Sequence, residues 1–427
     1  MSAVAPAEAD VSARAVARAS RRLLPFLFVL YVVAYLDRIN VSFAALQMRR
    51  DLGFDAAVYG LGAGIFFVGY FLFEVPSNLI LARVGARRWI ARILFSWGTV
   101  SVATTLVRDV PTFYALRFLL GVAEAGFFPG VILYLGYWFP SAERARAIAR
   151  FMTATAVAGV VGGPLSGALL GLDGAAGLAG WRWLFLVEGV PAVALGVVVL
   201  VWLPDGPADA AWLEPAERAA LVARLGVDHA ATPEHAATTR AALADRRVWF
   251  LGLLYFVLVN GIYGVSLWLP QIVERLAGAG DLVVGVLSAV PYAVAAVGMV
   301  IVGAHSDRTG ERRRHVAACA LVGAGGLGAA ALVAEPVASL AALSCGALGI
   351  WSAMGPFWAM PARVLRASGA AAGIALVNSL GNLGGFVGPW AVGRLTEATG
   401  EFAAGLVVLA GALVVAALLA AVAPEPR

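Results

Sequence analysis

The chain has 427 residues, of which 61% are apolar and 13% are charged, and its formal net charge is +5. Average soluble domains are about 45–50% apolar and about 25% charged, so this composition excludes an ordinary water-soluble protein and indicates an integral membrane protein. Every basic residue is an arginine. The chain therefore lacks the phosphate-binding lysine of an ATP-driven pump and the lysine of Schiff-base enzymes.

Twelve apolar runs follow one another along the chain, each close to the roughly 20 residues that a helix needs to cross a bilayer. Six precede a polar stretch and six follow it. The runs cover 23–45, 58–82, 89–108, 110–134, 147–170, 183–203, 248–270, 282–303, 316–334, 338–361, 370–393 and 403–423. The sequence therefore predicts an all-α integral membrane protein with twelve transmembrane helices in two six-helix halves.

The polar segments predict the domain organisation and the orientation. Residues 1–22 lack the apolar core of a signal peptide, so we expect a mobile cytoplasmic tail. We expect residues 204–247 to be a cytoplasmic linker with a short amphipathic helix, between six-helix bundles at 23–203 and 248–423, and 424–427 to be a second tail. Most arginines fall in the tails, the linker and the loops of one side, which places both termini in the cytoplasm. We expect a multi-pass protein of a bacterial inner (plasma) membrane.

Two unrelated motifs recur at one offset of 225 residues. The first pairs Gly85, in the loop after the second run, with Gly310, in the loop after the eighth. The second pairs Gly163-Pro164 in the fifth run with Gly388-Pro389 in the eleventh. This repetition indicates a duplicated six-helix unit. Parallel halves of this kind are a known transporter architecture, in which the substrate site lies between the halves near the middle of the membrane.

The loop and helix motifs resemble those of a known family. The loop "GAHSDRTGERRR" carries Asp307, Arg308 and Gly310, and the loop "NLILARVGARRW" carries Arg83, Gly85, Arg87 and Arg88. Both resemble the loop signature of the major facilitator superfamily, although Ala82 stands where that signature usually has Asp. The segments "YLDRINVSFA", "EVPSN", "RFLLGVAEAGFFPG" and "GWRWLFLVEG" resemble the anion:cation symporter branch. The resemblance spans nearly the whole chain and implies uptake of organic anions such as tartrate, sugar acids, phthalate or hydroxyphenylacetate.

Charged residues inside the predicted spans are the first candidates for function. A charge at the bilayer centre costs several kcal/mol, so it usually faces a polar cavity. All such residues fall in the first half: Asp37, Arg38, Glu74, Arg117, Glu124 and Glu188.

Arg38 is the predicted clamp for a substrate carboxylate. A guanidinium holds a carboxylate through two parallel hydrogen bonds and does not lose its proton. Tyr35 and Ser42 share a helix face with Arg38, so Tyr35 is expected beside the clamp. The alternative reading is an ion pair that only stabilises the first half.

Glu124 and Asp37 are the predicted proton-coupling acids, together with Arg117. Counting residues from the helix ends places Asp37 and Arg117 at similar depth, so we expect these two to pair when Asp37 is ionised. Glu124 is then left near the midplane without a basic partner, where burial favours its protonated form. The family resemblance implies the same two acids. The alternative for Glu124 is a permanently protonated structural acid.

Glu74 is expected to act as a gate, or to latch the loop that holds Arg83, Arg87 and Arg88 in place of the missing loop Asp, rather than to carry protons. Glu188 is expected to be a structural contact.

Neutral side chains are expected to complete the substrate site. Tyr70 and Thr155 match substrate-contact positions of the family that the chain resembles. Asn378 and Asn382 are four residues apart, so they share a helix face. Asn260, Tyr263, Trp351 and Trp358 are further candidates, for which packing or interhelical contact is the alternative.

The sequence thus predicts a secondary active transporter that carries a small organic anion with protons by alternating access. A hydroxylated acid of the tartrate or sugar-acid type is the first choice and an aromatic acid the second. Two alternatives stay open: anion exchange through the same site, and a non-transporting sensor built on a transporter fold. No nucleophile–base set or metal motif is present, so neither an enzyme nor a cofactor is expected. The expected partners are the organic anion, protons and the lipid bilayer, and we expect a monomer.

Overall fold

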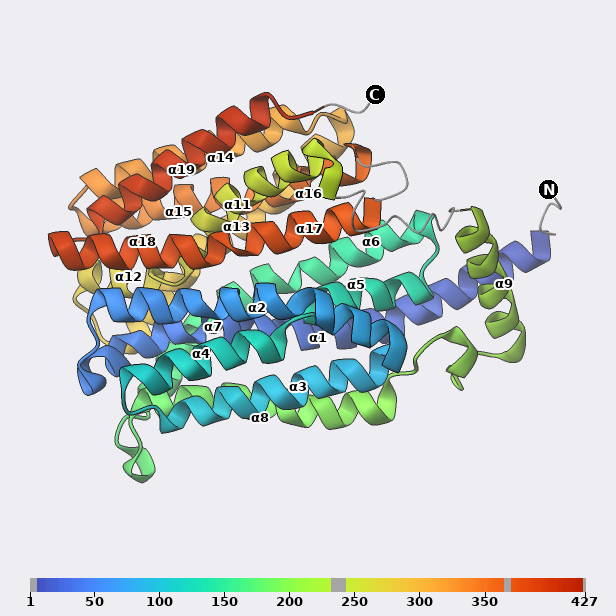
Figure 1. The fold of residues 1–427 in the computed structure, drawn as a ribbon, viewed down its shortest axis with the longest axis horizontal. Helices are drawn as coiled ribbons and strands as arrows, with labels where there is room; N and C mark the ends of the chain where they lie inside the picture. The colour runs from blue at the N-terminus through green and yellow to red at the C-terminus, as the bar shows by residue number, and fades with distance from the viewer. Residues whose placement is uncertain (1–5, 232–242, 365–369, 425–427) are drawn as a thin grey trace.

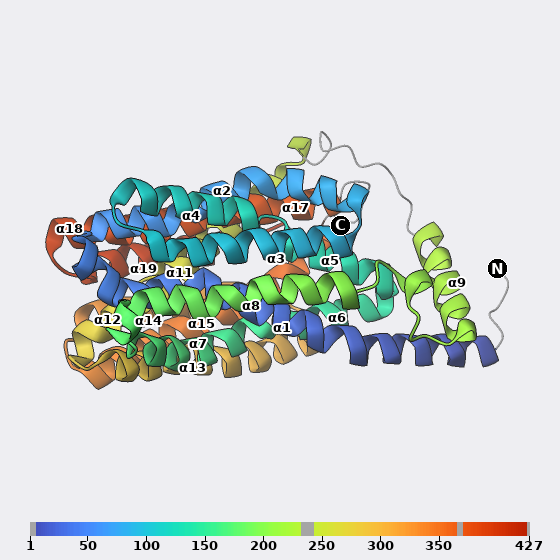
Figure 2. The same cartoon turned by 90° about the horizontal axis from the view of Figure 1, so that it is seen from below.

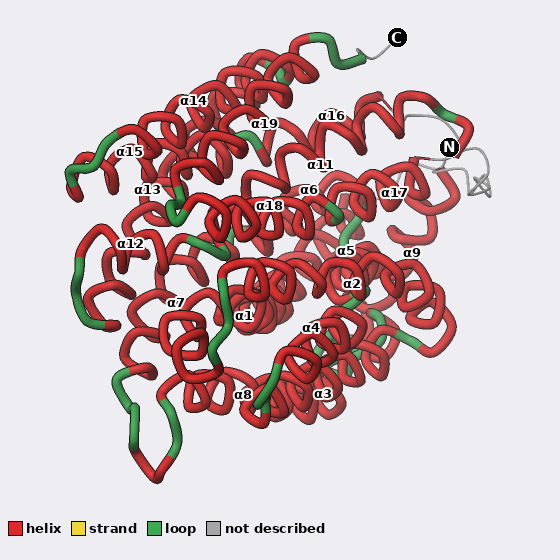
Figure 3. Tube along the Cα trace, turned by 60° about the vertical axis from the view of Figure 1, so that its left-hand side comes forward, coloured by secondary structure: helices red, strands yellow, loops and turns green. Residues whose placement is uncertain are grey.

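The computed structural model of the protein describes residues 6–231, 243–364 and 370–424, and within these ranges every regular element is a helix. The long helices run alongside one another and are joined mostly by short loops (Figures 1 and 3). The predicted all-α architecture is therefore confirmed.

The first half is built from α1 to α8, coloured blue to green in Figure 1. Its α-helices are α1 (Pro6–Leu52), α2 (Ala56–Val84), α3 (Ala86–Ala103), α4 (Val110–Glu124), α5 (Phe127–Trp138), α6 (Ser141–Met152), α7 (Ala154–Leu170) and α8 (Gly180–Trp202), with short 3-10 turns η1 (Thr104–Leu106) and η2 (Ala175–Gly177). The polar stretch that follows holds η3 (Pro207–Asp209) and α9 (Pro215–Ala231). The predicted amphipathic helix of the linker is therefore confirmed.

The second half is built from α11 to α19, coloured yellow-green to red. Its helices are α11 (Arg246–Ser266), α12 (Leu269–Ala277), α13 (Asp281–Thr309), α14 (Arg313–Leu332), α15 (Pro336–Ser352), α16 (Met354–Val364), α17 (Ala370–Asn382), α18 (Gly384–Thr399) and α19 (Ala403–Ala421). The predicted C-terminal tail lies outside the described residues except for its first residue, and so does part of the linker, 232–242.

Ten helical stretches of the described chain are long and apolar enough to cross a membrane. They match ten of the twelve predicted runs. The run at 89–108 corresponds to α3, which has 18 residues and carries Arg87, Arg88 and Arg92. The run at 370–393 corresponds to α17 and α18, which are separated by a break and have 13 and 16 residues. These last two spans are thus shorter or more polar than the rest.

The N-terminal segment differs from the predicted mobile tail. Helix α1 already begins at Pro6 and runs without interruption to Leu52. It extends beyond the bundle and packs against α9 (Figures 1 and 2). The ion pair between Arg18 and the buried Glu217, 2.9 Å apart, joins the two helices. The prediction failed because hydropathy identifies only the membrane part of a helix, whereas this alanine-rich segment has high helix propensity and a docking surface.

The two halves close tightly at one end, which we call the sealed end. There α7 crosses α13 and α2 crosses α18. A Cβ atom on Gly163 would overlap the carbonyl oxygen of Gly285, and one on Gly60 would lie 2.6 Å from the carbonyl oxygen of Pro389. Gly60 and Gly285 are separated by the 225-residue repeat offset, so the two crossings are equivalent. The sealed end therefore depends on backbone-to-backbone packing.

Candidate functional site

Arg38 lies at the boundary between the halves and binds to both of them. Its Nη2 donates to Oε1 of Glu124, at the end of α4, and its Nη1 donates to the hydroxyl oxygen of Tyr263 on α11 at 3.0 Å. All three side chains are buried. Tyr263 follows Arg38 by 225 residues, so the two residues occupy equivalent positions in the repeat. The centre of the molecule thus holds a cation in one half and a neutral hydroxyl in the other.

Aromatic rings surround the Arg38 guanidinium. Its central carbon lies 5.2 Å from the ring centroid of Tyr70 and 5.5 Å from that of Phe66. Phe67 in turn contacts the ring of Tyr263, with 4.3 Å between centroids. These rings exclude water and stabilise the cation through their π faces. The structure therefore brings the predicted residue Tyr70 next to Arg38.

Glu124 has a basic partner, contrary to the prediction. Depth along the helices did not indicate Arg38 as the partner, because Arg38 reaches Glu124 from another helix. The chain breaks directly after Glu124, because Gly126 adopts the left-handed conformation, with φ +87°, and a Cβ there would overlap the Ser77 side chain. Among the described residues, Oε2 of Glu124 and Nε of Arg38 are buried without a hydrogen-bond partner. The pair thus keeps unused hydrogen-bonding capacity.

The predicted ion pair between Asp37 and Arg117 is absent. Asp37 accepts hydrogen bonds from Trp97 Nε1 at 2.6 Å, Ser101 Oγ at 2.7 Å and Asn40 Nδ2 at 3.1 Å. The position of a residue along its helix does not determine the direction in which its side chain points around the helix. Because consecutive helical residues point about 100° apart, Asp37 faces α3 while Arg38 faces α4 and α11.

Arg117 is bound to backbone instead of to an acid. Its Nε and Nη2 each donate at 3.3 Å, to the carbonyl oxygens of Gly62 and Ala63 on α2. The guanidinium also lies 5.2 Å from the ring centroid of Phe66. In this conformation Arg117 therefore stabilises the contact between α2 and α4.

Glu74 does not latch the arginine loop. It is 3% exposed. Its Oε1 accepts from Asn378 Nδ2 and its Oε2 accepts from Ser379 Oγ at 2.8 Å, both on α17 of the other half. Asn382 lies close to the same carboxylate. Asn378 and Asn382 share a face, as predicted, but they line this second site rather than the Arg38 site.

The acid that serves the first loop is Asp205, after α8. Its Oδ1 accepts from the backbone N–H of Arg87 at 2.9 Å, and its Oδ2 lies 3.6 Å from the Nε of Arg87. A Cβ on Gly85, where φ is +96°, would lie 2.9 Å from the Asp205 carboxylate. Sequence reasoning missed Asp205 because it is remote from the loop in the chain. Arg83 and Arg88 are exposed beside this contact.

The corresponding loop of the second half keeps its own acid. Asp307 pairs with Arg312 at 2.7 Å. Arg308 is exposed. Gly310 ends α13 in the left-handed conformation with φ +69°. Arg87 and Arg312, which are equivalent in the repeat, thus both pair with an aspartate. The aspartate follows α8 in the first half and belongs to α13 in the second.

The remaining predicted residues do not hydrogen-bond to Arg38 in this structure, although Tyr35 lies only one helical turn away. Tyr35 packs in a small cluster with Leu36, Ile39 and Ala158. Thr155 donates to the carbonyl oxygen of Met152 in the preceding turn at 2.9 Å. Glu188 accepts from Ser166 at 3.1 Å and so links α8 to α7. Of the further candidates, Tyr263 binds Arg38 and the other three pack against neighbours: Trp351 against Tyr292, Trp358 against Tyr255, and Asn260 against Gly384 and Gly388.

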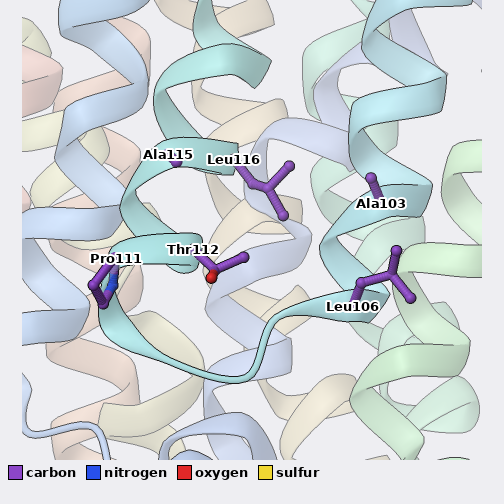
Figure 4. A pocket seen from close by; sticks show the side chains of 6 residues that line it. All are labelled: Ala103, Leu106, Pro111, Thr112, Ala115 and Leu116. Atoms are coloured by element: carbon purple, nitrogen blue, oxygen red, sulfur yellow. The ribbon is translucent and has the colours of Figure 1, made fainter.

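Two surface pockets lie outside these sites. One, of about 520 Å³, lies between the end of α3 and the start of α4 and is lined by Ala103, Leu106, Pro111, Thr112, Ala115 and Leu116 (Figure 4). Its walls carry no charge, so it does not suit an organic anion. The other, of about 510 Å³ at the sealed end, is lined by Arg49, Ala56, Gln271, Glu274, Arg275, Thr396, Glu397, Gly400 and Phe402. It mixes both signs of charge.

The family described as Major Facilitator Superfamily matches residues 27–389. A protein of Agrobacterium vitis named "Putative tartrate transporter" is 50% identical over 97% of both chains. A "Quinolone resistance transporter" of Acinetobacter baumannii is 45% identical over 91% of this chain and 90% of its own.

A solved structure has the same fold. It is a bacterial homologue of the human lysosomal transporter Spinster in an inward-facing and occupied conformation. The two proteins are 18% identical, the TM-score is 0.76, and the match covers 94% of this chain and 96% of that one. The predicted fold class is therefore confirmed.

Proposed function

Because this chain belongs to the major facilitator superfamily, and is a multi-pass membrane transporter rather than an enzyme, we propose that it carries a small organic anion together with protons. The preferred cargo is a carboxylate such as tartrate or a sugar acid. The observation that carries the proposal is the buried Arg38, held between Glu124 of one half and Tyr263 of the other.

Competition for Arg38 would couple the anion to the proton. Arg38 keeps its charge at any physiological pH and binds carboxylates. An incoming carboxylate takes the place of Glu124 on the guanidinium. The displaced Glu124 is then a buried carboxylate without a cation, and protonation removes the cost of that charge. Binding of the anion at Arg38 therefore favours uptake of a proton by Glu124.

Asp37 is the proposed second proton site. Three neutral donors surround it and it is fully buried. Coupling through an Asp37–Arg117 pair is not part of this proposal, because the two residues have other partners.

The chemistry of the site and one relative support the substrate class. The hydroxyl of Tyr263 binds Arg38 and suits a hydroxylated acid, as does the similarity to the tartrate-named protein. The aromatic walls also suit an aromatic acid. A quinolone belongs among the test compounds because of the second relative.

The proposed setting is a bacterial inner membrane with both termini in the cytoplasm, so that the sealed end faces outwards. The bundles at 23–203 and 248–423 are the proposed moving units, with the linker 204–247 between them. A monomer suffices, because one chain supplies both sides of the Arg38 site.

Uptake into proteoliposomes with an inward proton gradient tests the proposal. Wild type should accumulate a labelled carboxylate when a pH gradient is the only driving force. Glu124→Gln should lose this accumulation while it retains counterflow exchange of the same acid. Equal gradient-driven accumulation by both proteins would contradict the role of Glu124.

The same assay separates the alternatives. Wild-type counterflow without gradient-driven accumulation would favour an anion exchanger. Binding of a labelled anion without any movement would favour a sensor.

A further inference from the structure

Glu74 places a carboxylate of one half in a ring of donors from the other half. Both of its oxygens are engaged across the boundary, Oε1 by the Asn378 amide and Oε2 by the Ser379 hydroxyl at 2.8 Å. Asn382 supplies a third polar group nearby. Since α2 begins at the sealed end, Glu74 lies about 27 Å along the helix from that end. It therefore ties the halves together towards their inner ends.

The tie has no bonded cation among the described residues. The helices packed around α2 carry several ionisable groups, but Asp37, Arg117 and Glu124 are engaged elsewhere, and Arg394 and Glu397 lie near the sealed end. Arg38, Tyr70 and Tyr255 are the groups that interact with Glu74 through space. The described side chains of α17 carry no charge. Hydrogen bonds from the other half thus stabilise the Glu74 charge.

This arrangement links the charge to the contact between the halves. Hydrogen bonds to an ionised acceptor are roughly twice as strong as neutral ones. Separating α2 from α17 would leave a buried carboxylate without its donors, which is costly unless the group takes up a proton. A proton on Oε2 of Glu74 would replace these charge-assisted hydrogen bonds by weaker neutral ones, because the Ser379 hydroxyl would then accept from the new O–H while Asn378 still donates to Oε1.

The tie is present on one side of the repeat only. At the 225-residue offset, Glu74 corresponds to Met299, and Asn378 and Ser379 correspond to Thr153 and Ala154.

The glycine crossings of the sealed end, in contrast, occur in both halves. Two carboxylates also join the halves there: Asp281 accepts from Gln47 at 2.7 Å, and Glu397 accepts from the backbone N–H of Ala56 at 3.0 Å. Both are more exposed than Glu74. Glu74 differs from them because its carboxylate is buried and lies towards the inner ends of the halves.

We propose that Glu74 is a protonation-controlled latch that holds the inner ends of the halves together when it is ionised and releases them when it is protonated. The inference rests on the proposed function, since a latch matters only if the halves move. It assigns a role to a third acid, separate from the Arg38–Glu124 pair.

Distances between spin labels at the inner ends test the latch in the full-length protein in nanodiscs. The labels go on Val84→Cys at the end of α2 and Arg314→Cys at the start of α14, both exposed positions. The native cysteines, Cys319 and Cys345, are replaced by alanine. Distances are measured at about pH 8 and about pH 5, which bracket the range in which perturbed carboxyl groups commonly titrate.

In the parent protein, the long-distance fraction should rise about threefold or more between the higher and the lower pH, because the latch loses its charge. Glu74→Gln should show the long distance at both pH values. The double variant Asn378→Ala/Ser379→Ala keeps the carboxylate but removes its donors, and should do the same. Glu188→Gln, which neutralises a buried acid bonded within the first half, should retain the parent response.

A wild-type pH response in Glu74→Gln would overturn the inference, and so would a short distance at high pH in the double variant. If Glu74→Gln does not fold, the double variant decides. This readout requires no transported acid. A lack of carboxylate uptake with the expected distances would therefore reject the proposed function and leave the latch intact.

Discussion

At the scale of single residues, the central cation is shared between the halves. Arg38 binds an acid of its own half and a hydroxyl of the other. A rearrangement of the halves changes the second contact and leaves the first available. The hydrogen bond between Arg38 and the Tyr263 hydroxyl therefore depends on the position of the second half.

Removing that hydroxyl should weaken substrate binding without unfolding the protein. A hydrogen bond to a charged group contributes about 1.5–3 kcal/mol, so Tyr263→Phe should raise the KM for the carboxylate by roughly tenfold or more. Initial rates of uptake over a range of substrate concentrations measure this change.

The control is Tyr134→Phe, which removes a hydroxyl that donates to the carbonyl oxygen of Pro204 at 2.8 Å, away from Arg38. It should leave KM unchanged. An equal change in KM in both variants would contradict a specific role for Tyr263.

At the scale of elements, the breaks between helices position the acids. Helix α4 ends at Glu124, and Gly126 reverses the backbone before α5 begins. The break therefore sets the direction of α5 relative to α4 and leaves Glu124 at the end of its helix.

Gly126→Ala should therefore lower both stability and transport. An alanine in the left-handed region costs about 1–3 kcal/mol, and its Cβ also overlaps Ser77. We expect a lower Tm in detergent and uptake reduced several-fold.

Gly136→Ala is a matched control, because Gly136 lies in α5 with open space around it. This substitution should leave Tm and uptake near the parent values. A Tm of Gly126→Ala equal to that of the control would show that the break tolerates a side chain.

At the scale of the whole molecule, the halves are joined differently at their two ends. The sealed end combines glycine crossings with polar contacts such as Gln47–Asp281, whereas Glu74 makes a buried polar tie towards the inner end. Close packing resists a single added methyl group, since backbone atoms cannot move aside locally.

Gly163→Ala should force the halves apart at the sealed end. A single cysteine at Ala56, which is buried at that end, should react several-fold faster with a membrane-impermeant maleimide in this variant. Gly325→Ala adds the same methyl group in open space and should leave the labelling rate unchanged. Equal labelling rates in both variants would contradict the role of the crossing.

The sequence by itself determined the helical membrane fold, the duplication and the residues that carry embedded charge, because hydropathy and a fixed repeat offset are written along the chain. It also pointed to Arg38 and Tyr70, and it included Tyr263 only among several further candidates. Only the tertiary structure decided which charges meet. Glu124 bonds to Arg38, Asp37 bonds to Trp97 and Ser101, and Glu74 bonds to α17. These partners depend on the direction that each side chain takes around its helix and on which helices are neighbours. The position of a residue along its helix determines neither of these.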